Sequence, residues 1–303
     1  MSRIHEALKK AEQEKASQQP QAPGPVSAPR YREGSSAPSF TTSAVVEPPI
    51  SRNRPNDVSG GTRFEDLVAR CTHPEWKSTS ELLVPLTGES QKAFGERFRT
   101  LRSRLYQVAG TRTLRRVLVT SSVQGEGKTF VATNLVRSII RQADRRVLLI
   151  DADLRAPRLH TSLGAPSGPG LSDFLRGEAD EYQIIQNTSM APNLCFIPCG
   201  SRVSNPSELL LSDRMKVLLD TITPAFDWVI LDTPPSLPVH DANSLADICD
   251  GVLFVVKAGE TAFESAKKAA SGFREKNLLG VVLNQVEDSG EDGAQYYGSH
   301  DHK

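Results

Sequence analysis

The chain has 303 residues, and its 36 lysines and arginines are balanced by 36 aspartates and glutamates. A chain without net charge is not an obvious nucleic-acid coat or polybasic membrane binder, so we expect no nucleic-acid partner. No run reaches the roughly 18 consecutive apolar residues of a membrane helix, and the charged N-terminus does not resemble a signal peptide. These features predict a cytoplasmic protein with one large or two ordinary domains.

The N-terminal fifth of the chain differs in composition from the rest. Within residues 1–16, apolar side chains recur at helical spacing, which predicts a short helix. Its apolar stripe is narrow, so it is either a fraying end or a docking helix for a partner. Residues 17–61 are rich in proline, serine, alanine and glutamine and are predicted to be a disordered linker.

From about residue 90, short apolar runs alternate with helical patterns. The runs of strand length are 117–120, 147–150, 194–197, 228–231, 252–256 and 281–283. The helical stretches between them are 128–142, 207–222, 241–248 and 262–276. Apolar strands that alternate with helices predict a doubly wound, mostly parallel α/β sheet covered on both faces. We assign this domain to residues 82–287 and a flexible tail to 288–303.

The first of these strands leads into a phosphate-binding loop at residues 122–129. Gly125 and Gly127 allow a tight backbone turn, so successive N–H groups can point at phosphate oxygens. Lys128 can reach the outer phosphates of a nucleotide, and the Thr129 hydroxyl can bind Mg²⁺. Ser122 stands where the general pattern has glycine. The strand before the loop and the helix after it make a chance match improbable.

Aspartates follow two other strands. Asp151 and Asp153 leave the second strand, and Asp232 ends the strand at 228–231. Carboxylates at such positions are expensive to bury without partners, which favours a nearby cation or a proton to be abstracted. The three motifs together therefore predict a P-loop nucleoside triphosphatase site.

These residues resemble the bacterial tyrosine autokinases of capsule and exopolysaccharide biosynthesis, the BY-kinases. Residues 122–129 match the Walker A motif of that family, residues 148–155 its Walker A′ motif and residues 229–235 its Walker B motif. The resemblance implies ATP and Mg²⁺ as cofactors and transfer of the γ-phosphoryl group to tyrosine. The ATP contacts that it implies are Ser122, Gln124, Gly125, Glu126, Gly127, Lys128, Thr129, Phe130 and Asn284.

The resemblance also implies catalytic and metal-binding roles. Lys128, Asp151 and Asp153 become the catalytic residues, with Asp151 as the candidate base. Thr129, Asp153 and Asp232 become the metal ligands, directly or through water. The sequence leaves open which of the two Walker A′ aspartates is the base.

Two further features fit the same family. Glu96, Arg99 and Arg102 match a Glu-x-x-Arg-x-x-Arg helix, which implies subunit contacts in a ring-shaped homo-oligomer. Tyr296 and Tyr297 form a short tyrosine tail, which implies phosphorylation by a neighbouring subunit in trans. Because relatives often carry more tail tyrosines, the extent of this phosphorylation stays open.

The resemblance implies a membrane-anchored polysaccharide chain-length regulator as partner and activator, with recruitment to the inner face of the membrane. Two alternatives remain. A partitioning or cell-division ATPase of the same superfamily usually has a second lysine early in the loop, at the position of Val123 here. A non-catalytic, ATP-dependent scaffold of a polysaccharide assembly complex would carry the same binding motifs.

Overall fold

A computed structural model of the chain describes residues 63–77 and 89–286. The helices before the fifth strand are α2 (Phe64–Arg70), α3 (Glu89–Ala109), α4 (Lys128–Ile140), α5 (Leu159–Leu163), α6 (Leu171–Arg176), α7 (Glu181–Ile184), α8 (Pro206–Leu210), α9 (Asp213–Ile222) and the 3₁₀ helix η1 (Thr223–Ala225). The later helices are α10 (Asp241–Ala246) and α11 (Phe263–Ser271). The strands are β1 (Arg116–Ser121), β2 (Val147–Asp151), β3 (Gln186–Thr188), β4 (Ala191–Ile197), β5 (Trp228–Asp232), β6 (Gly251–Lys257) and β7 (Leu278–Asn284).

The strands form one sheet in the order β3-β4-β2-β5-β1-β6-β7. All neighbours are parallel except the edge pair β3 and β4, which is antiparallel. All six strands expected from the apolar runs are present, each somewhat longer than expected. The prediction of a doubly wound, mostly parallel sheet is confirmed.

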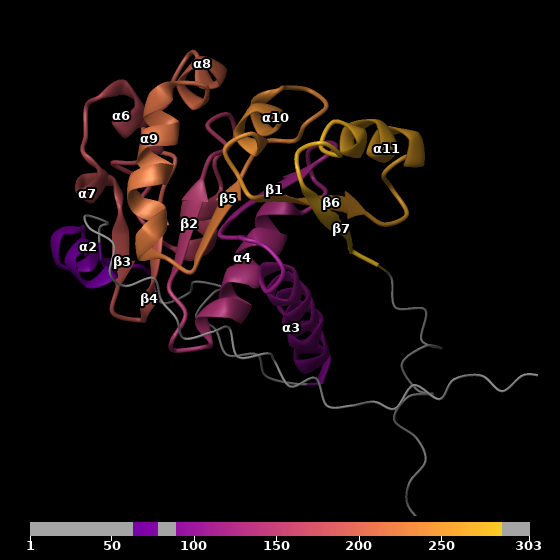
Figure 1. Cartoon of the computed structure of the whole chain (residues 1–303), viewed down its shortest axis with the longest axis horizontal. Coiled ribbons are helices and arrows are strands. Elements are labelled where there is room, and N and C mark those ends of the chain that lie inside the picture. Colours follow the sequence, from indigo (N-terminus) through magenta and orange to yellow (C-terminus); the bar gives the residue numbers. More distant parts are fainter. Residues whose placement is uncertain (1–62, 78–88, 287–303) are drawn as a thin grey trace, which may run out of the picture. The chain divides into compact units, whose positions relative to one another are not determined.

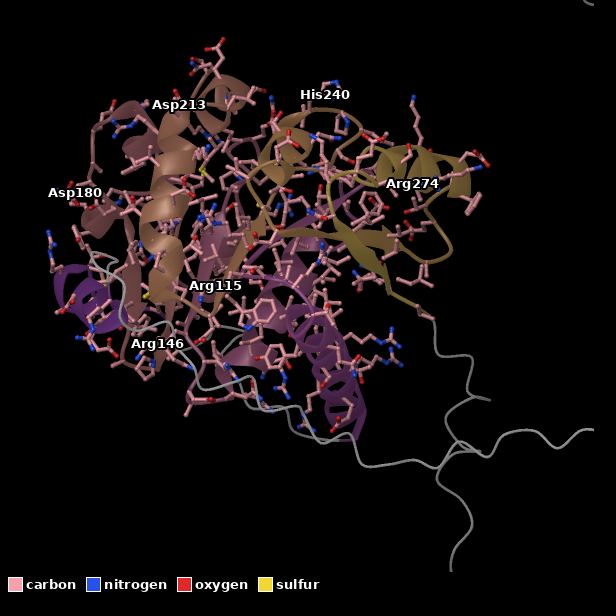
Figure 2. All side chains as sticks on the ribbon, in the orientation of Figure 1. Arg115, Arg146, Asp180, Asp213, His240 and Arg274 are labelled. Atoms are coloured by element: carbon pink, nitrogen blue, oxygen red, sulfur yellow. The ribbon has the colours of Figure 1, made fainter. Side chains whose placement is uncertain are left out.

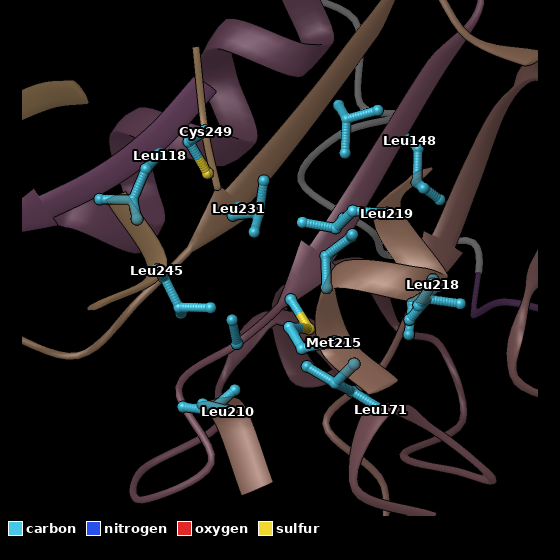
Figure 3. Close-up of a cluster of buried hydrophobic side chains, with 14 of the residues drawn as sticks. Leu118, Leu148, Leu171, Leu210, Met215, Leu218, Leu219, Leu231, Leu245 and Cys249 are labelled. Carbon is cyan, nitrogen blue, oxygen red and sulfur yellow. The ribbon is translucent and has the colours of Figure 1, made fainter. Parts of the chain in front are cut away.

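Helices flank the sheet and enclose a core on each of its faces (Figure 1). Charged side chains such as those of Asp180, Asp213 and Arg274 lie on the outside of the domain (Figure 2). One core gathers Leu118, Leu148 and Leu231 from the strands against Met215 and Leu219 of α9 (Figure 3). Because central strands are buried on both faces, their sequences are apolar throughout instead of alternating.

The elements that differ from expectation are short or interrupted. The stretch at 207–222, expected as one helix, is two helices, because the Ser212 backbone is extended and its hydroxyl donates to the carbonyl of Leu209 at 2.6 Å. The strand β3 was not expected, since Gln-Asn-Thr has no apolar pattern. Asn187 is held there by a hydrogen bond from its Nδ2 to the carbonyl of Leu194 at 2.7 Å.

The packed domain also includes residues 63–77, which the expected boundary at residue 82 leaves out. Leu67 of α2 is fully buried in the core beside the sheet, and Trp76 is buried in the core on the other face. The backbone of Thr72 forms a parallel bridge with Gln186 of β3. The sequence signal for this segment is weak because α2 has only 7 residues.

Leu67→Ala is expected to destabilise the domain by about 2–5 kcal/mol, because it removes a fully buried side chain and leaves a cavity. Urea unfolding followed by circular dichroism measures the change. The matched control Asp66→Ala, an exposed position one residue away, should cost less than about 1 kcal/mol. Equal midpoints for Leu67→Ala and the parent chain would show that α2 does not belong to the cooperative unit.

Several expected features lie outside the described residues: the helix at 1–16, the linker at 17–61 and the tail at 288–303 with Tyr296 and Tyr297. Among the helices at 63–77 and 89–286, none combines the length and the hydropathy that crossing a membrane requires.

Candidate active site

The strand order brings the predicted motifs to one edge of the sheet. The strand β5 lies between β1 and β2, and Asp232 at its end is the register partner of both Val119 and Asp151. All three strands are parallel, so their carboxyl ends meet at the same edge, where α/β proteins bind ligands. Residues far apart in sequence therefore surround one site.

The phosphate-binding loop has the expected backbone. Gly125 and Gly127 have φ angles of 91° and 88°, which L side chains rarely adopt. The side chain of Asn284 also packs closely against Gly127, since a Cβ added at Gly127 would lie 2.0 Å from Nδ2 of Asn284. Helix α4 begins directly after Gly127, and its free N–H groups and positive dipole end favour an anion in the loop.

Lys128 and Thr129, the first residues of α4, each bond to an aspartate from another strand. Nζ of Lys128 donates to Oδ2 of Asp153 at 2.9 Å. The Thr129 hydroxyl donates to Oδ2 of Asp232 at 2.6 Å. In this arrangement the lysine and the hydroxyl that could hold a nucleotide are already positioned by the protein.

Three largely buried carboxylates surround Lys128. Burial and the nearby charge of Asp232 raise the pKa of Asp151 to about 8, against hydrogen bonds from the N–H groups of Leu159 and Asp153. Burial likewise raises the pKa of Asp232 to about 6, although Lys128 opposes the shift. For Lys128 itself, burial lowers the pKa, but the carboxylates outweigh burial and the net pKa is raised. The lysine therefore stays charged.

A pocket of about 580 Å³ opens beside these residues. The expected site residues that line it are Gln124, Gly125, Gly127, Lys128, Thr129, Phe130 and Asp153. Its other walls come from the proline-rich turn after β5 and from residues 155–162 after β2. The pocket has the size range of small-molecule sites.

Three of the expected ATP contacts lie outside this lining because they brace the loop. Ser122 is fully buried, and Glu126 accepts hydrogen bonds from the backbone of Val123 at 2.7 Å and from the Thr261 hydroxyl at 2.6 Å. Asn284 donates through Nδ2 to the carbonyl of Glu126 at 2.9 Å. The Glu126 and Asn284 side chains thus support the loop, and the contacts of these three residues with ATP stay predictions.

The residues present fit a nucleotide with a divalent cation. Oδ1 of Asp232 is buried and has no hydrogen-bond partner, so a cation or its water could use it. Within the described ranges, no group of three or more His, Cys, Asp or Glu side chains could hold a metal by itself. A divalent cation such as Mg²⁺ usually takes one or two protein carboxylates and completes its shell with phosphates and water.

A polar network after β2 was not singled out from the sequence. Nε of Arg155 donates to Oδ2 of Asp241 at 2.8 Å, and its Nη2 donates to the Ser207 hydroxyl at 2.8 Å. Arg158, three residues on, is exposed at the pocket. Arg155 is the last residue of the Walker A′ match, and this position in the motif was the sequence signal that could have singled it out.

The charged helix before β1 differs from expectation at one position. Glu96 and Arg99 are exposed on α3 and form an ion pair with each other. Arg102 is buried, and its Nη1 donates to the carbonyl of Ser138 in α4 at 2.6 Å. Arg102 thus joins α3 to α4 within the subunit, and its role as a ring contact stays a prediction.

Comparisons with known proteins assign the family. A model described as an AAA domain matches residues 115–275. Tyrosine-protein kinase YwqD from Bacillus subtilis is 36% identical over 215 residues, which cover 70% of this chain and 90% of that protein. The chain belongs to the bacterial tyrosine-protein kinase family. Protein-tyrosine kinase activity is the activity of that family, and the identification made from the motifs is confirmed.

Other kinases match in the same region. Tyrosine-protein kinase CpsD from Streptococcus agalactiae is 35% identical over 61% of this chain and 82% of its own length. Tyrosine-protein kinase wzc from Salmonella typhi is 35% identical over 63% of this chain, which spans only 27% of that larger protein. The solved kinase domain of Escherichia coli tyrosine kinase ETK has a TM-score of 0.59 and 29% identity, over 75% of this kinase and 95% of that domain.

Proposed function

We propose that this kinase transfers the γ-phosphoryl group of ATP to tyrosines of its own C-terminal segment and thereby regulates capsule or exopolysaccharide synthesis and export. One observation supports the catalytic part: Lys128, Thr129 and Asp153 line one pocket, and Asp232 and Asp151 are buried directly behind them, where Asp232 accepts a hydrogen bond from Thr129. A partitioning ATPase would share the loop, but the relative that aligns over 90% of its length is a tyrosine-protein kinase.

The chemistry needs charge neutralisation and a proton acceptor. The tyrosine oxygen bonds to the γ-phosphorus while the bond from that phosphorus to the β–γ bridging oxygen breaks, and ADP leaves. Lys128 and the loop N–H groups oppose the phosphate charge. Asp151 accepts the tyrosine proton, since its raised pKa of about 8 suits a base working near neutral pH. Its burial without ligand does not disqualify it, because catalytic contacts often tighten in the substrate complex.

Mg²⁺ is the proposed metal. Thr129 and Asp232 would hold it, directly or through water, and Asp153 would support its hydration shell. When bound, Mg²⁺ neutralises charge on the transferring phosphoryl group. The lone Oδ1 of Asp232 supports this assignment.

Changing Tyr296 and Tyr297 together to Phe is expected to remove nearly all phosphotyrosine while ATP binding stays intact, because the pocket residues are untouched. Stability should change by no more than about 0.5 kcal/mol. Mass spectrometry after incubation with Mg-ATP locates the phosphate. Tyr182→Phe, which keeps both tail tyrosines, is the matched control and should label normally. Phosphate chiefly on Tyr31, Tyr106 or Tyr182 would contradict the tail assignment.

Mixing two variants tests transfer in trans. The double Phe chain keeps its pocket but lacks the proposed acceptors, whereas Lys128→Ala keeps the acceptors but lacks the lysine. Each alone should stay unlabelled, and the mixture should place phosphate on the Lys128→Ala chain. Phosphotyrosine absent from the mixture, despite an active parent, would favour transfer within one chain.

Assembly and localisation complete the proposal. The kinase forms a ring-shaped homo-oligomer, to which Glu96 and Arg99 contribute exposed charges on α3. A membrane-anchored chain-length regulator recruits it from the cytoplasm to the inner face of the membrane. The helix at 1–16 and the linker at 17–61 would form the tether. Analytical ultracentrifugation of Arg99→Glu against the parent tests the ring contact.

A further inference from the structure

Two arginines follow β2 at the edge of the active-site pocket: Arg155 and Arg158, here named the arginine pair. Both line the pocket, together with Lys128 and Asp153. Lys128 and Asp153 form an ion pair, so their charges are mutually compensated. The charges of the arginine pair are not used by the chemistry proposed above.

The two members differ in how they are held. Arg155 is fixed by Asp241 and Ser207 through its Nε and Nη2, and its side chain remains 38% exposed. Asp241 is itself almost fully buried, so this ion pair orients the guanidinium towards the pocket rim. Arg158 is exposed, and within residues 63–77 and 89–286 no side chain pairs with it. The pair therefore offers one oriented cation and one free cation.

The sheet order separates this pair from the phosphate-binding loop. The loop follows β1, whereas the arginine pair follows β2, and β5 lies between the two strands. Neighbouring strands are about 4.8 Å apart, so the two strand ends are about 10 Å apart. Asp151, the proposed base, ends β2 itself. The arginines thus lie on the side of the pocket where the acceptor tyrosine must approach.

The acceptor segment carries the complementary charge. Residues 287–295, directly before Tyr296, contain Glu287, Asp288, Glu291 and Asp292 and no lysine or arginine. Asp292 precedes Tyr296 by four residues, which span at most about 13–14 Å when extended. A tyrosine near Asp151 can therefore place the carboxylates before it on the arginine pair.

We propose that the arginine pair recognises the acidic residues before the acceptor tyrosine and so makes the kinase selective for acidic tyrosine peptides. This inference rests on the proposed function and adds its substrate preference. Arginine is suited to this role because its guanidinium binds carboxylates in two-pronged geometry. An exposed charge pair contributes little alone, so recognition needs several acidic residues together.

Peptide kinetics test the preference. The enzyme carries Tyr296→Phe and Tyr297→Phe, so that the added peptide is the only tail acceptor. One peptide has the sequence of residues 287–303, and a second replaces the four acidic residues before its tyrosines, at 287, 288, 291 and 292, with Gln or Asn. Arg158→Glu should raise KM for the acidic peptide roughly 5- to 10-fold and leave KM for the neutral peptide within about 2-fold. The difference should shrink in 0.5 M NaCl because salt screens exposed charges.

Control variants separate a charge effect from other causes. Arg158→Lys should keep most of the selectivity. Arg274→Glu makes the same charge change on an exposed arginine after α11 (Figure 2), which does not line the pocket, and should not alter either KM. An equal rise in KM for both peptides, or an equal rise in KM for ATP, would overturn the proposal; the latter would assign Arg158 to the nucleotide.

A binding measurement keeps this test independent of catalysis. Fluorescence anisotropy of the labelled peptides, with a non-hydrolysable ATP analogue present, should show tighter binding of the acidic peptide and its selective loss in Arg158→Glu. Selective binding without phosphate transfer would support the arginine pair but contradict the proposed kinase chemistry. Phosphate transfer to both peptides with equal KM and equal affinity would overturn the proposed role of the arginine pair in peptide selectivity, but not the proposed kinase chemistry.

Discussion

Lys128→Ala is expected to reduce tyrosine phosphorylation to background, a loss of roughly 10²–10³-fold or more. Lys128 is the cation that lies among Asp151, Asp153 and Asp232, and its Nζ bonds to Asp153. Without it, an incoming triphosphate would meet three carboxylates and no opposing side-chain charge in the loop. Phosphotyrosine blotting measures transfer, and isothermal titration calorimetry measures ATP affinity. Normal labelling in this variant would show that the loop is not the nucleotide site.

The same substitution also removes the counter-charge of Asp153, whose side chain is only 4% exposed. Breaking a buried pair destabilises a protein because a charge is left uncompensated. A second variant, Lys128→Met with Asp153→Asn, removes both charges and should restore the unfolding midpoint without restoring phosphorylation. Recovery of labelling in the double variant would assign the lysine a purely structural role.

Asp151→Asn should slow phosphoryl transfer by roughly 10²–10⁴-fold while ATP still binds, because an amide cannot accept the tyrosine proton. Single-turnover quench-flow with bound Mg-ATP separates the chemical step from binding. Asp153→Asn, two residues further along the chain, is the matched comparison and should weaken ATP and Mg²⁺ binding more than it slows transfer in the bound complex. Unchanged transfer in Asp151→Asn, with loss in Asp153→Asn, would reassign the base to Asp153.

Asp151→Asn should also stabilise the protein free of nucleotide and divalent cation. The folded carboxyl has a pKa of about 8, against an ordinary value of 3.8. Between these values the folded state holds a proton that the unfolded state has released, so the stability of the parent falls as pH rises. We expect a gain of about 1–3 kcal/mol at pH 8 and a much smaller one at pH 5.

Thermal unfolding in EDTA at the two pH values measures this gain. Glu275→Gln, at an exposed position, is the control and should change stability by no more than about 0.5 kcal/mol at either pH. A gain in Asp151→Asn that is the same at pH 5 and pH 8 would show that a buried charge is not its source.

The sequence by itself determined the parallel sheet and the phosphate-binding loop. Apolar runs such as 228–231 indicate strands that are buried on both faces, because neither face of such a strand is exposed to solvent. Gly125, Gly127 and Lys128 are recognisable in sequence since a loop that wraps phosphate needs these residue types at fixed spacing. Short elements such as α2 and β3 were missed, because they are stabilised by contacts with distant residues and carry no periodic pattern of their own.

Only the tertiary structure decided what the individual site residues touch. Arg102 follows the spacing of a charged surface helix, yet the packing of α3 against α4 buries it on the carbonyl of Ser138. Glu126 and Asn284 match nucleotide contacts in sequence, but the fold directs both to brace the loop. Arg155 meets Asp241 across 86 residues of chain. Spacing along a chain specifies local geometry, whereas burial and pairing between distant residues depend on how strands and helices pack in three dimensions.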